Sequence, residues 1–255
     1  MAAPPLSIVM PVLNEAEGIS AALQALAPLV ARGVQVVVAD GGSTDGTQAL
    51  VQQYLRDITN SSMVGNLAGT QAADAAQPVQ AIQIIKAPRG RAVQMNAGAR
   101  HASAALLLFL HADTALPADA DRLIEQALAE SRGKQFWGRF DVHIAGRPWL
   151  LRVIGQMMNV RSRWTGIATG DQAIFMSRAA FDAVGGFPVQ ALMEDIEISS
   201  RLLRMSRPAC LHARVVTAGR RWESRGVWRT MLLMWRLRFA YWRGVAPDRL
   251  AQQYR

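Results

Sequence analysis

Residues 34–47 read Val34-Gln35-Val36-Val37-Val38-Ala39-Asp40-Gly41-Gly42-Ser43-Thr44-Asp45-Gly46-Thr47. The β-branched, apolar run that ends at Ala39 is typical of a buried strand in a parallel sheet. The loop that follows contains Ser43-Thr44-Asp45, and these residue types cap the N-terminus of a helix. The stretch therefore predicts a strand, a loop and a helix in succession, with Asp40 directly beyond the end of the strand.

The same alternation extends over the first 110 residues. Further strands are predicted at 7–12, 81–86 and 105–110, and helices at 17–30, 47–54 and 91–102. Strands that alternate with helices indicate a mostly parallel α/β sheet of Rossmann-like build, flanked by helices.

Ligands of such sheets bind beyond the carboxyl ends of the strands. Four polar clusters of this sequence lie just past those ends: Asn14-Glu15, Asp40, the stretch 86–91 and His111-Ala112-Asp113. We expect them to converge on one crevice.

After residue 114 the predicted strands and helices alternate less regularly. Helices are predicted at 117–131, 149–160, 179–184 and 195–205, and strands at 135–144, within 169–177 and at 213–217. Residues 60–78, rich in Ala, Gly, Ser, Asn and Gln, are expected to be a flexible surface insertion. We divide the chain into a domain at 1–220 and a basic, helical C-terminal segment at 221–255.

Composition places the chain among soluble globular proteins. Its 255 residues are 51% hydrophobic and 18% charged, enough for a sizeable core. The lone Cys210 excludes an internal disulfide, so we expect a reducing cytoplasm and a small, buried role for this residue. Neither a leader peptide nor an apolar run near the ~20 residues of a membrane span is present, which argues against an integral membrane protein.

The net charge of +9 is concentrated at the C-terminal end. Residues 201–255 contain thirteen Arg against Glu223 and Asp248, a local balance of +11, and the rest of the chain is close to neutral. A basic tail on a neutral body suggests an anionic partner: phosphate groups, a lipid surface or nucleic acid.

Asp113 is a candidate metal ligand. A carboxylate just beyond a buried strand can hold Mg²⁺ or Mn²⁺ and leave coordination positions for phosphate oxygens and water. The alternative is that Asp113 merely caps the helix that follows. The sequence also leaves the role of His111 open: it is a second metal ligand, a ribose contact or a loop histidine without contact to a ligand.

Glu194, Asp195 and Glu197 stand at a predicted helix start, where the helix dipole favours acids. The alternative is a general base, Asp195, whose pKa is tuned by its neighbour Glu194. Arg89-Gly90-Arg91 follows a strand and suits a phosphate or a base, with a solvated loop as the alternative, and the guanidinium groups of Arg220-Arg221-Trp222 suit a pyrophosphate.

Together these clusters resemble glycosyltransferase family 2. The resemblance rests on Ile8-Val9-Met10-Pro11-Val12-Leu13-Asn14-Glu15, on 38–47, on His111-Ala112-Asp113, on Gly185-Gly186-Phe187 and on Glu194-Asp195. The combination of Gly170-Asp171-Gln172, Leu192-Met193-Glu194-Asp195 and Tyr241-Trp242-X-Gly244-Val245 resembles a narrower bacterial subgroup. That subgroup comprises small soluble transferases associated with radical-SAM and selenium-domain proteins, some linked to arsenosugar synthesis.

The resemblance implies a GT-A fold and an inverting, metal-dependent transfer of a sugar from a UDP-, GDP- or TDP-sugar to a hydroxyl acceptor, either a small molecule or lipid-linked. It also implies residue roles. Asp195, supported by Glu194, would deprotonate the acceptor, and Asp113 would bind Mg²⁺ or Mn²⁺. The remaining donor contacts would be Pro11, Glu15, Asp40, Arg89, Arg91, His111 and Arg221, with Asp171, Gln172 and Trp222 at the donor sugar or acceptor.

Three departures from the family pattern bear on mechanism. The family usually has an acid at the first position of its Asp-X-Asp motif, but this sequence has His111 there. Where the family commonly has two adjacent acids after the second strand, this sequence has only Asp40. Processive synthases carry Gln-X-X-Arg-Trp, but the Gln position is Ala218, which favours a single transfer.

Three alternatives of other classes remain open. A catalytically inactive nucleotide-sugar-binding protein would keep Asp40 and the arginines. A nucleic-acid-binding protein would use the Arg-rich tail, although that tail lacks a docking motif and leaves the acidic crevice unexplained. A nucleotidyltransferase would need a Gly-rich, Arg-containing loop after the first strand, and none follows it.

Residues 227–243 place Trp228, Trp235 and Trp242 on one helical stripe, beside a stripe of arginines. The simpler interpretation is a helix that packs its aromatics on the domain or in a homodimer. The alternative is an interfacial helix that holds the enzyme at an anionic membrane, on its inner face.

Overall fold

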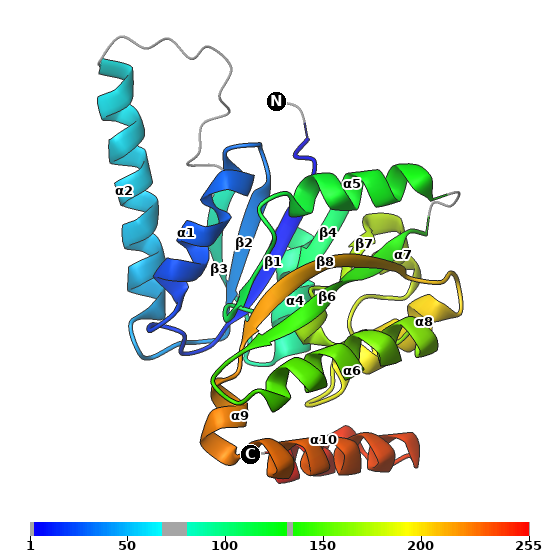
Figure 1. Ribbon diagram of the computed structural model, residues 1–255. Coiled ribbons are helices and arrows are strands. Elements are labelled where there is room, and N and C mark those ends of the chain that lie inside the picture. The colour runs from blue at the N-terminus through cyan, green and yellow to red at the C-terminus, as the bar shows by residue number, and fades with distance from the viewer. Residues whose placement is uncertain (1–2, 68–80, 132–134, 255) are drawn as a thin grey trace.

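The computed structural model describes residues 3–67, 81–131 and 135–254. In this part of the chain eight strands form one sheet in the order β3-β2-β1-β4-β7-β6-β8-β5 (Figure 1). The strands are β1 (Ser7–Val12), β2 (Gln35–Asp40), β3 (Ile82–Lys86), β4 (Leu106–Phe109), β5 (Thr114–Ala115), β6 (Trp137–Ala145), β7 (Phe175–Ser177) and β8 (Ala209–Ala218). The helices are α1 (Ile19–Val30), α2 (Thr47–Leu67), α4 (Arg91–His101), α5 (Ala120–Glu130), α6 (Leu150–Thr165), η1 (Gly170–Gln172), α7 (Arg178–Ala183), α8 (Glu194–Leu203), α9 (Arg220–Arg225), α10 (Val227–Trp242) and α11 (Pro247–Tyr254).

Strands β1 to β4 form the parallel half of the sheet. Val9 of β1 is opposite Val37 of β2 on one side and Phe109 of β4 on the other, and β3 continues the parallel order beyond β2. The prediction of a parallel α/β sheet from the first 110 residues is confirmed.

The second half of the sheet is mixed. Strand β7 runs antiparallel to both β4 and β6, whereas β8 runs parallel to β6 over most of its length. The short strand β5 pairs antiparallel with the end of β8. This pairing brings residues 114–115 beside residues 216–217, so the loop with Asp113 and the segment after β8 meet.

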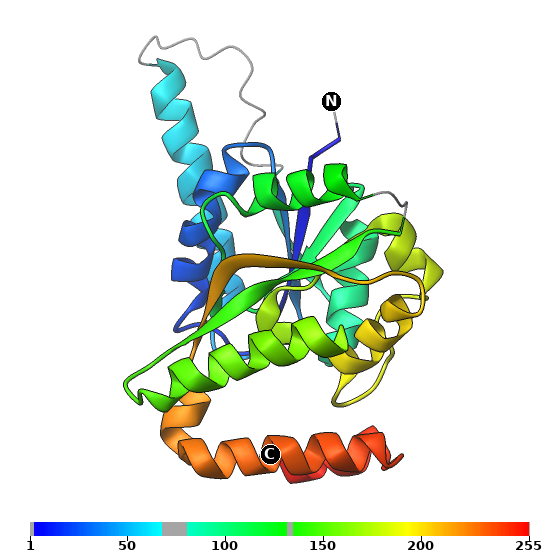
Figure 2. The same ribbon diagram turned by 45° about the vertical axis from the view of Figure 1, so that its right-hand side comes forward.

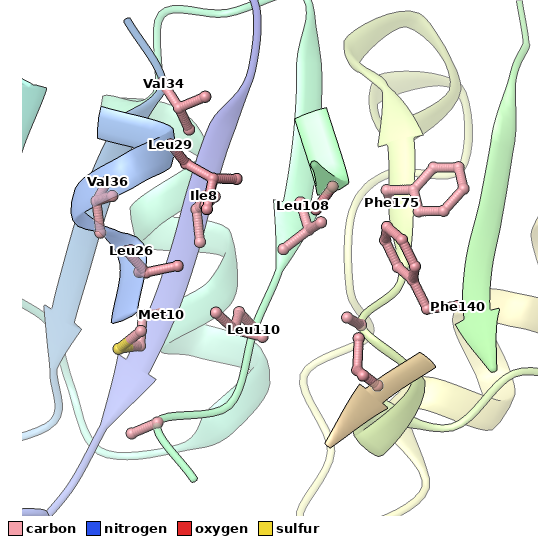
Figure 3. Packing of buried hydrophobic residues seen from close by; sticks show 14 of the residues in the cluster. Ile8, Met10, Leu26, Leu29, Val34, Val36, Leu108, Leu110, Phe140 and Phe175 are labelled. Carbon is pink, nitrogen blue, oxygen red and sulfur yellow. The ribbon is translucent and has the colours of Figure 1, made fainter. Parts of the chain in front are cut away.

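Hydrophobic side chains alternate between the two faces of the sheet. On β1, Ile8 and Met10 join a cluster with α1, α5 and α6, whereas Val9 joins a second cluster with α4, α7 and α8. Figure 3 shows the first cluster, with Leu26 and Leu29 of α1 lying over the strands. Helix α4 approaches β1 closely, since a Cβ on Gly98 would lie 2.3 Å from Val9 Cγ1.

Two features differ from the sequence predictions. Helix α2 extends to Leu67, well past the predicted end at residue 54, and so takes in the first part of the expected insertion. The remainder of that insertion, from residue 68, lies outside the described residues. Cys210 is half-buried rather than buried, because it lies near the start of β8, where the strand pairs with β6 on one side only among the described strands.

The C-terminal helices pack on one another and on α8. Leu237 of α10 and Leu250 of α11 form a small apolar cluster with Met193, the residue that precedes α8. Within the described ranges, no helix combines the length and the apolar character that crossing a membrane requires.

Candidate active site

A narrow pocket lies beyond the carboxyl ends of the parallel strands, which point the same way in Figure 3. It brings together the end of β4, the start of α4, η1 and the start of α8. Its lining consists of Arg91, Met95, Phe109, His111, Gly170, Ile174, Phe187, Glu194 and Asp195. Four of the residues predicted from sequence therefore meet in one place.

Asp195 is held at the start of α8 by two backbone donors. Gly170 N donates to its Oδ2 at 2.8 Å and Ile196 N donates to its Oδ1 at 2.8 Å. Burial, reinforced by the negative charge of Glu194, nevertheless raises the pKa of Asp195 from 3.8 to about 6. A carboxylate with this pKa is ionised at neutral pH and basic enough to accept a proton.

Glu194 is buried beside Asp195 and pairs with Arg91. The Arg91 guanidinium, at the first turn of α4, lies 3.3 Å from Glu194 Oε1, although 103 residues separate the two along the chain. This ion pair joins the start of α4 to the acidic start of α8.

His111 links the end of β4 to η1. Its Nδ1 lies 3.6 Å from Asp171 Oδ1, and its ring packs on Gly170, where a Cβ would lie 2.6 Å from Cε1. Only a glycine permits this approach. The contact places His111 and the half-exposed Asp171 on the same side of the pocket as Asp195.

Asp113 is exposed at the mouth of the crevice. Its backbone oxygen accepts a hydrogen bond from Ala218 N at 3.1 Å, so it is fixed to the end of β8. Glu15 is a close electrostatic neighbour: burial first, and then the charge of Asp113, raise the pKa of Glu15. The predicted convergence of the clusters at Glu15, His111 and Asp113 is therefore present.

The basic cluster after β8 faces this mouth. Arg220 lies 3.6 Å from Glu17, and its positive charge acts on Glu15. Trp222 is half-buried and packs against the main core, and its contact with a sugar stays a prediction. Arg221 is the second residue of α9, and its side chain lies outside what the structure describes.

Asp40 is fully buried, which corrects the expectation that it contacts the nucleoside directly. Its Oδ2 accepts from Gly42 N, Ser43 N and Gln48 Nε2 at 2.6–3.1 Å, so the carboxylate holds the loop after β2 in shape. Gln94, which the sequence analysis missed, supports the same loop. Its amide donates to Val12 O and Ala39 O at 2.7 and 2.8 Å and so ties the ends of β1 and β2 together.

Gln172 is also fully buried, so it does not face a sugar as expected. Its Nε2 donates to Ser162 Oγ at 3.0 Å, and its side chain completes a capping box with Thr169. Gln172 therefore fixes η1 to α6. Of the remaining predicted contacts, Pro11 is half-buried near the end of β1 and Arg89 is exposed in the loop after β3.

Backbone strain is concentrated at the site. Among the described residues, those other than glycine with positive φ are Asn14 (56°), Ala173 (47°) and Met193 (66°). Each is next in sequence to a predicted site residue: Glu15, Gln172 or Glu194. Such conformations persist only where the surrounding structure imposes them, and they gather at functional sites.

Replacing Ala173 with glycine is expected to leave the free energy of unfolding nearly unchanged. The loss of a buried methyl group, about 0.8 kcal/mol, is offset by relief of a left-handed conformation that costs about 1 kcal/mol. Ala168→Gly is the matched control, since Ala168 is equally buried but lacks positive φ. It should lose about 1–2 kcal/mol. Urea unfolding measures both, and equal losses would show that Ala173 is unstrained.

The donor set is suited to a divalent metal that takes most of its ligands from a substrate. Among the described residues, no three His, Cys, Asp or Glu side chains form a group that holds a metal unaided. Mg²⁺ is commonly bound through one or two carboxylates together with phosphate oxygens and water. The exposed carboxylate of Asp113, with Glu15 beside it, fits such a metal–pyrophosphate complex.

The sheet order and the crevice define the class of protein: this is the GT-A fold of glycosyltransferases. The chain belongs to glycosyl transferase family 2, since the model of that family matches residues 7–185.

Solved structures support the fold. The chain is 22% identical to a mannosyltransferase, PcManGT from Pyrobaculum calidifontis, solved in complex with GDP-Man and Mn²⁺. The TM-score is 0.61 over 94% of this chain and 62% of that one. It is 17% identical to S. aureus TarS 1–349 in complex with UDP-GlcNAc, with a TM-score of 0.60 over 84% of this chain and 58% of that one. The chain thus spans about three fifths of the length of each. A comparison with curated proteins gave no match.

Proposed function

We propose that the protein transfers a single sugar from a nucleotide-sugar donor to a hydroxyl acceptor, with inversion at the anomeric carbon. The observation that carries the proposal is the Asp195 carboxylate, whose pKa is raised to about 6 at the edge of a pocket shared with Arg91 and His111. A site that only binds a nucleotide sugar has no need of such a base.

Asp195 would accept the proton of the acceptor hydroxyl. The acceptor oxygen would then attack the anomeric carbon as the bond to the nucleoside diphosphate breaks, and the electron pair of that bond would leave with the diphosphate. A single base that acts from the face opposite the leaving group would invert the anomeric carbon. Retained configuration in the product, seen by NMR, would contradict it.

Arg91 and Arg220 supply positive charge for the leaving diphosphate, together with Arg89 and Arg221 as predicted from sequence. A divalent metal held by Asp113 would add electrostatic stabilisation of the developing charge. Asp40 and Gln94 would act indirectly, since they shape the backbone on which the nucleoside rests.

The proposed donor is a UDP-, GDP- or TDP-sugar. The neighbours with GDP-Man and UDP-GlcNAc support the first two, and the mannosyltransferase with Mn²⁺ supports a divalent metal. Membership of the radical-SAM-associated subgroup is proposed on sequence motifs alone. Peripheral membrane contact, a homodimer and a cytoplasmic location likewise stay proposals.

A panel of nucleotide sugars tests the reaction class. We expect slow release of UDP, GDP or TDP from one donor in the presence of Mn²⁺ or Mg²⁺, and its loss when EDTA is added. Thermal shifts on the same panel serve as the control for binding. A donor that binds without any turnover, with or without candidate acceptors, would favour the inactive nucleotide-sugar-binding protein. A panel that gives no binding at all would refute a transferase.

A further inference from the structure

Two helices of the protein present an apolar face to solvent. On α6 the exposed side chains are Trp149, Val153, Met157, Val160 and Trp164, and on α10 they are Trp228, Leu232, Trp235, Phe239 and Trp242. Trp149 directly precedes α6, and the spacing within each set is that of one side of a helix. Five of the seven tryptophans in the sequence belong to these two sets.

Both faces are fixed in this orientation because the opposite side of each helix is held. Asn159 of α6 accepts a hydrogen bond from Val142 N and donates one to Val142 O, which fastens this helix to β6. Leu237 of α10 is buried against Met193 and Leu250. Neither apolar face can therefore turn into the core, and the expectation that the tryptophans of residues 227–243 pack on the domain is not met.

The two helices lie side by side at one end of the molecule in both Figure 1 and Figure 2. Neither helix contains an acidic residue, and their exposed arginines are Arg152 in α6 and Arg229 and Arg236 in α10. We call the two apolar faces with these arginines the α6–α10 surface.

We propose that the α6–α10 surface docks on an anionic lipid bilayer. Tryptophan side chains are enriched at the headgroup level of membranes, and arginines beside them bind lipid phosphates. Exposed apolar surface of this extent marks an interaction site in a soluble protein. The most exposed members, Trp164 (88%) and Trp242 (78%), would insert first.

Charge favours a bilayer over a second copy of the chain. A two-fold symmetric dimer through this surface would place arginines against arginines with no acid on either helix to neutralise them.

The surface is also connected to the part of the pocket that contains Asp195. Helix α6 leads into η1, where Gly170 N contacts Asp195, and Ser162 of α6 accepts from Gln172. Helix α10 reaches α8 through Tyr241, whose hydroxyl donates to Glu197 Oε2 at 3.1 Å. Resting on the proposed function, this placement points to an acceptor hydroxyl carried by a membrane amphiphile.

Co-sedimentation with vesicles tests the docking. We expect the full-length protein to pellet with vesicles of phosphatidylcholine plus phosphatidylglycerol, and to stay in solution with phosphatidylcholine alone. The double variant Arg229→Gln/Arg236→Gln should bind about tenfold more weakly or worse, given the contribution of each Arg near an anionic surface. Trp164→Ala/Trp242→Ala should also lose binding, and the wild type should show a blue-shifted tryptophan emission on binding that this variant lacks.

Arg56→Gln/Arg122→Gln is the matched control. Arg56 and Arg122 are exposed, and the helices that contain them, α2 and α5, lie away from α6 and α10 in Figure 1, so this variant should bind as the wild type does. If both double variants bind vesicles equally more weakly than the wild type, binding depends on net charge alone and the proposed docking surface is wrong. Absence of vesicle binding, with a dimer in light scattering that Trp164→Ala/Trp242→Ala converts to monomer, would assign the surface to a second copy instead. Donor hydrolysis without vesicles is measured on every variant, so a failure of docking is distinguishable from a failure of the proposed transferase activity.

Discussion

Replacing Asp195 with asparagine is expected to lower the rate of sugar transfer by about 10²–10⁴-fold, the usual contribution of a general base. Donor binding should persist, because the pocket keeps Arg91 and His111. Transfer is measured with the donor found in the panel, radiolabelled, and with a membrane lipid extract or a set of small hydroxyl compounds as acceptors. Slow hydrolysis of the donor by water should fall much less.

Glu197→Gln is the matched control for this variant. Glu197 belongs to the same acidic helix start but pairs with Arg201 at 3.0 Å, away from the pocket lining. Transfer by Glu197→Gln should stay near the wild-type rate. Equal transfer by Asp195→Asn and the wild type would remove Asp195 from the role of base.

Two pH measurements separate a base from a merely structural carboxylate. The wild-type kcat/KM should fall with decreasing pH below about 6, where Asp195 becomes protonated. Because the folded-state pKa lies above the unfolded value, the contribution of Asp195 to stability decreases as the pH rises from about 4 to about 6 and stays lost above that. Two pKa units correspond to about 3 kcal/mol, and asparagine gives up one backbone hydrogen bond of about 1 kcal/mol. At pH 8 we therefore expect Asp195→Asn to be more stable than the wild type by about 2 kcal/mol.

The second large effect is expected at Asp113. Asp113→Asn should weaken the Mn²⁺-dependent binding of nucleoside diphosphate and lower turnover by about 10²-fold or more, because a bound metal contributes several kcal/mol of charge stabilisation. Binding of UDP and GDP is measured by calorimetry with Mn²⁺ and with EDTA. In EDTA the variant and the wild type should bind alike, since the carboxylate acts through the metal.

Asp119→Asn is the control for Asp113. Asp119 is an exposed acid six residues further along, at the start of α5, and its replacement removes the same charge without touching the crevice. If wild-type binding is the same with EDTA as with Mn²⁺, and Asp113→Asn binds and turns over like the wild type, the arginines alone would stabilise the leaving group.

Much of the fold follows from local pattern. The runs at β1 and β2 are apolar and β-branched, and the helices α1 and α4 have clear amphipathic spacing or strong boundaries, so their positions are predictable. The convergence of Glu15, His111 and Asp113 follows from the parallel order, because the carboxyl ends of adjacent strands share one edge.

Other features depend on partners far away in sequence. Strand β5 is only two residues long and exists because Thr114 and Ala115 pair with the end of β8, about a hundred residues later. The same distance separates Arg91 from Glu194. The burial of Asp40 and Gln172 could not be predicted from the sequence either. A motif gives the position of a polar side chain but not whether it binds a ligand or hydrogen-bonds to its own loop. The role of Gln94 could not be predicted from the sequence, because its hydrogen-bond partners are backbone carbonyls of two other strands.

The pairing of β5 with β8 also bears on how the protein is made. A nascent chain that has emerged from the ribosome as far as residue 113 contains β1 to β4 and can begin to assemble the parallel half. The loop with Asp113 stays without its anchor until Ala218 has been synthesised. We therefore expect translation intermediates to form the parallel half of the sheet early and to fix the loop with Asp113 late.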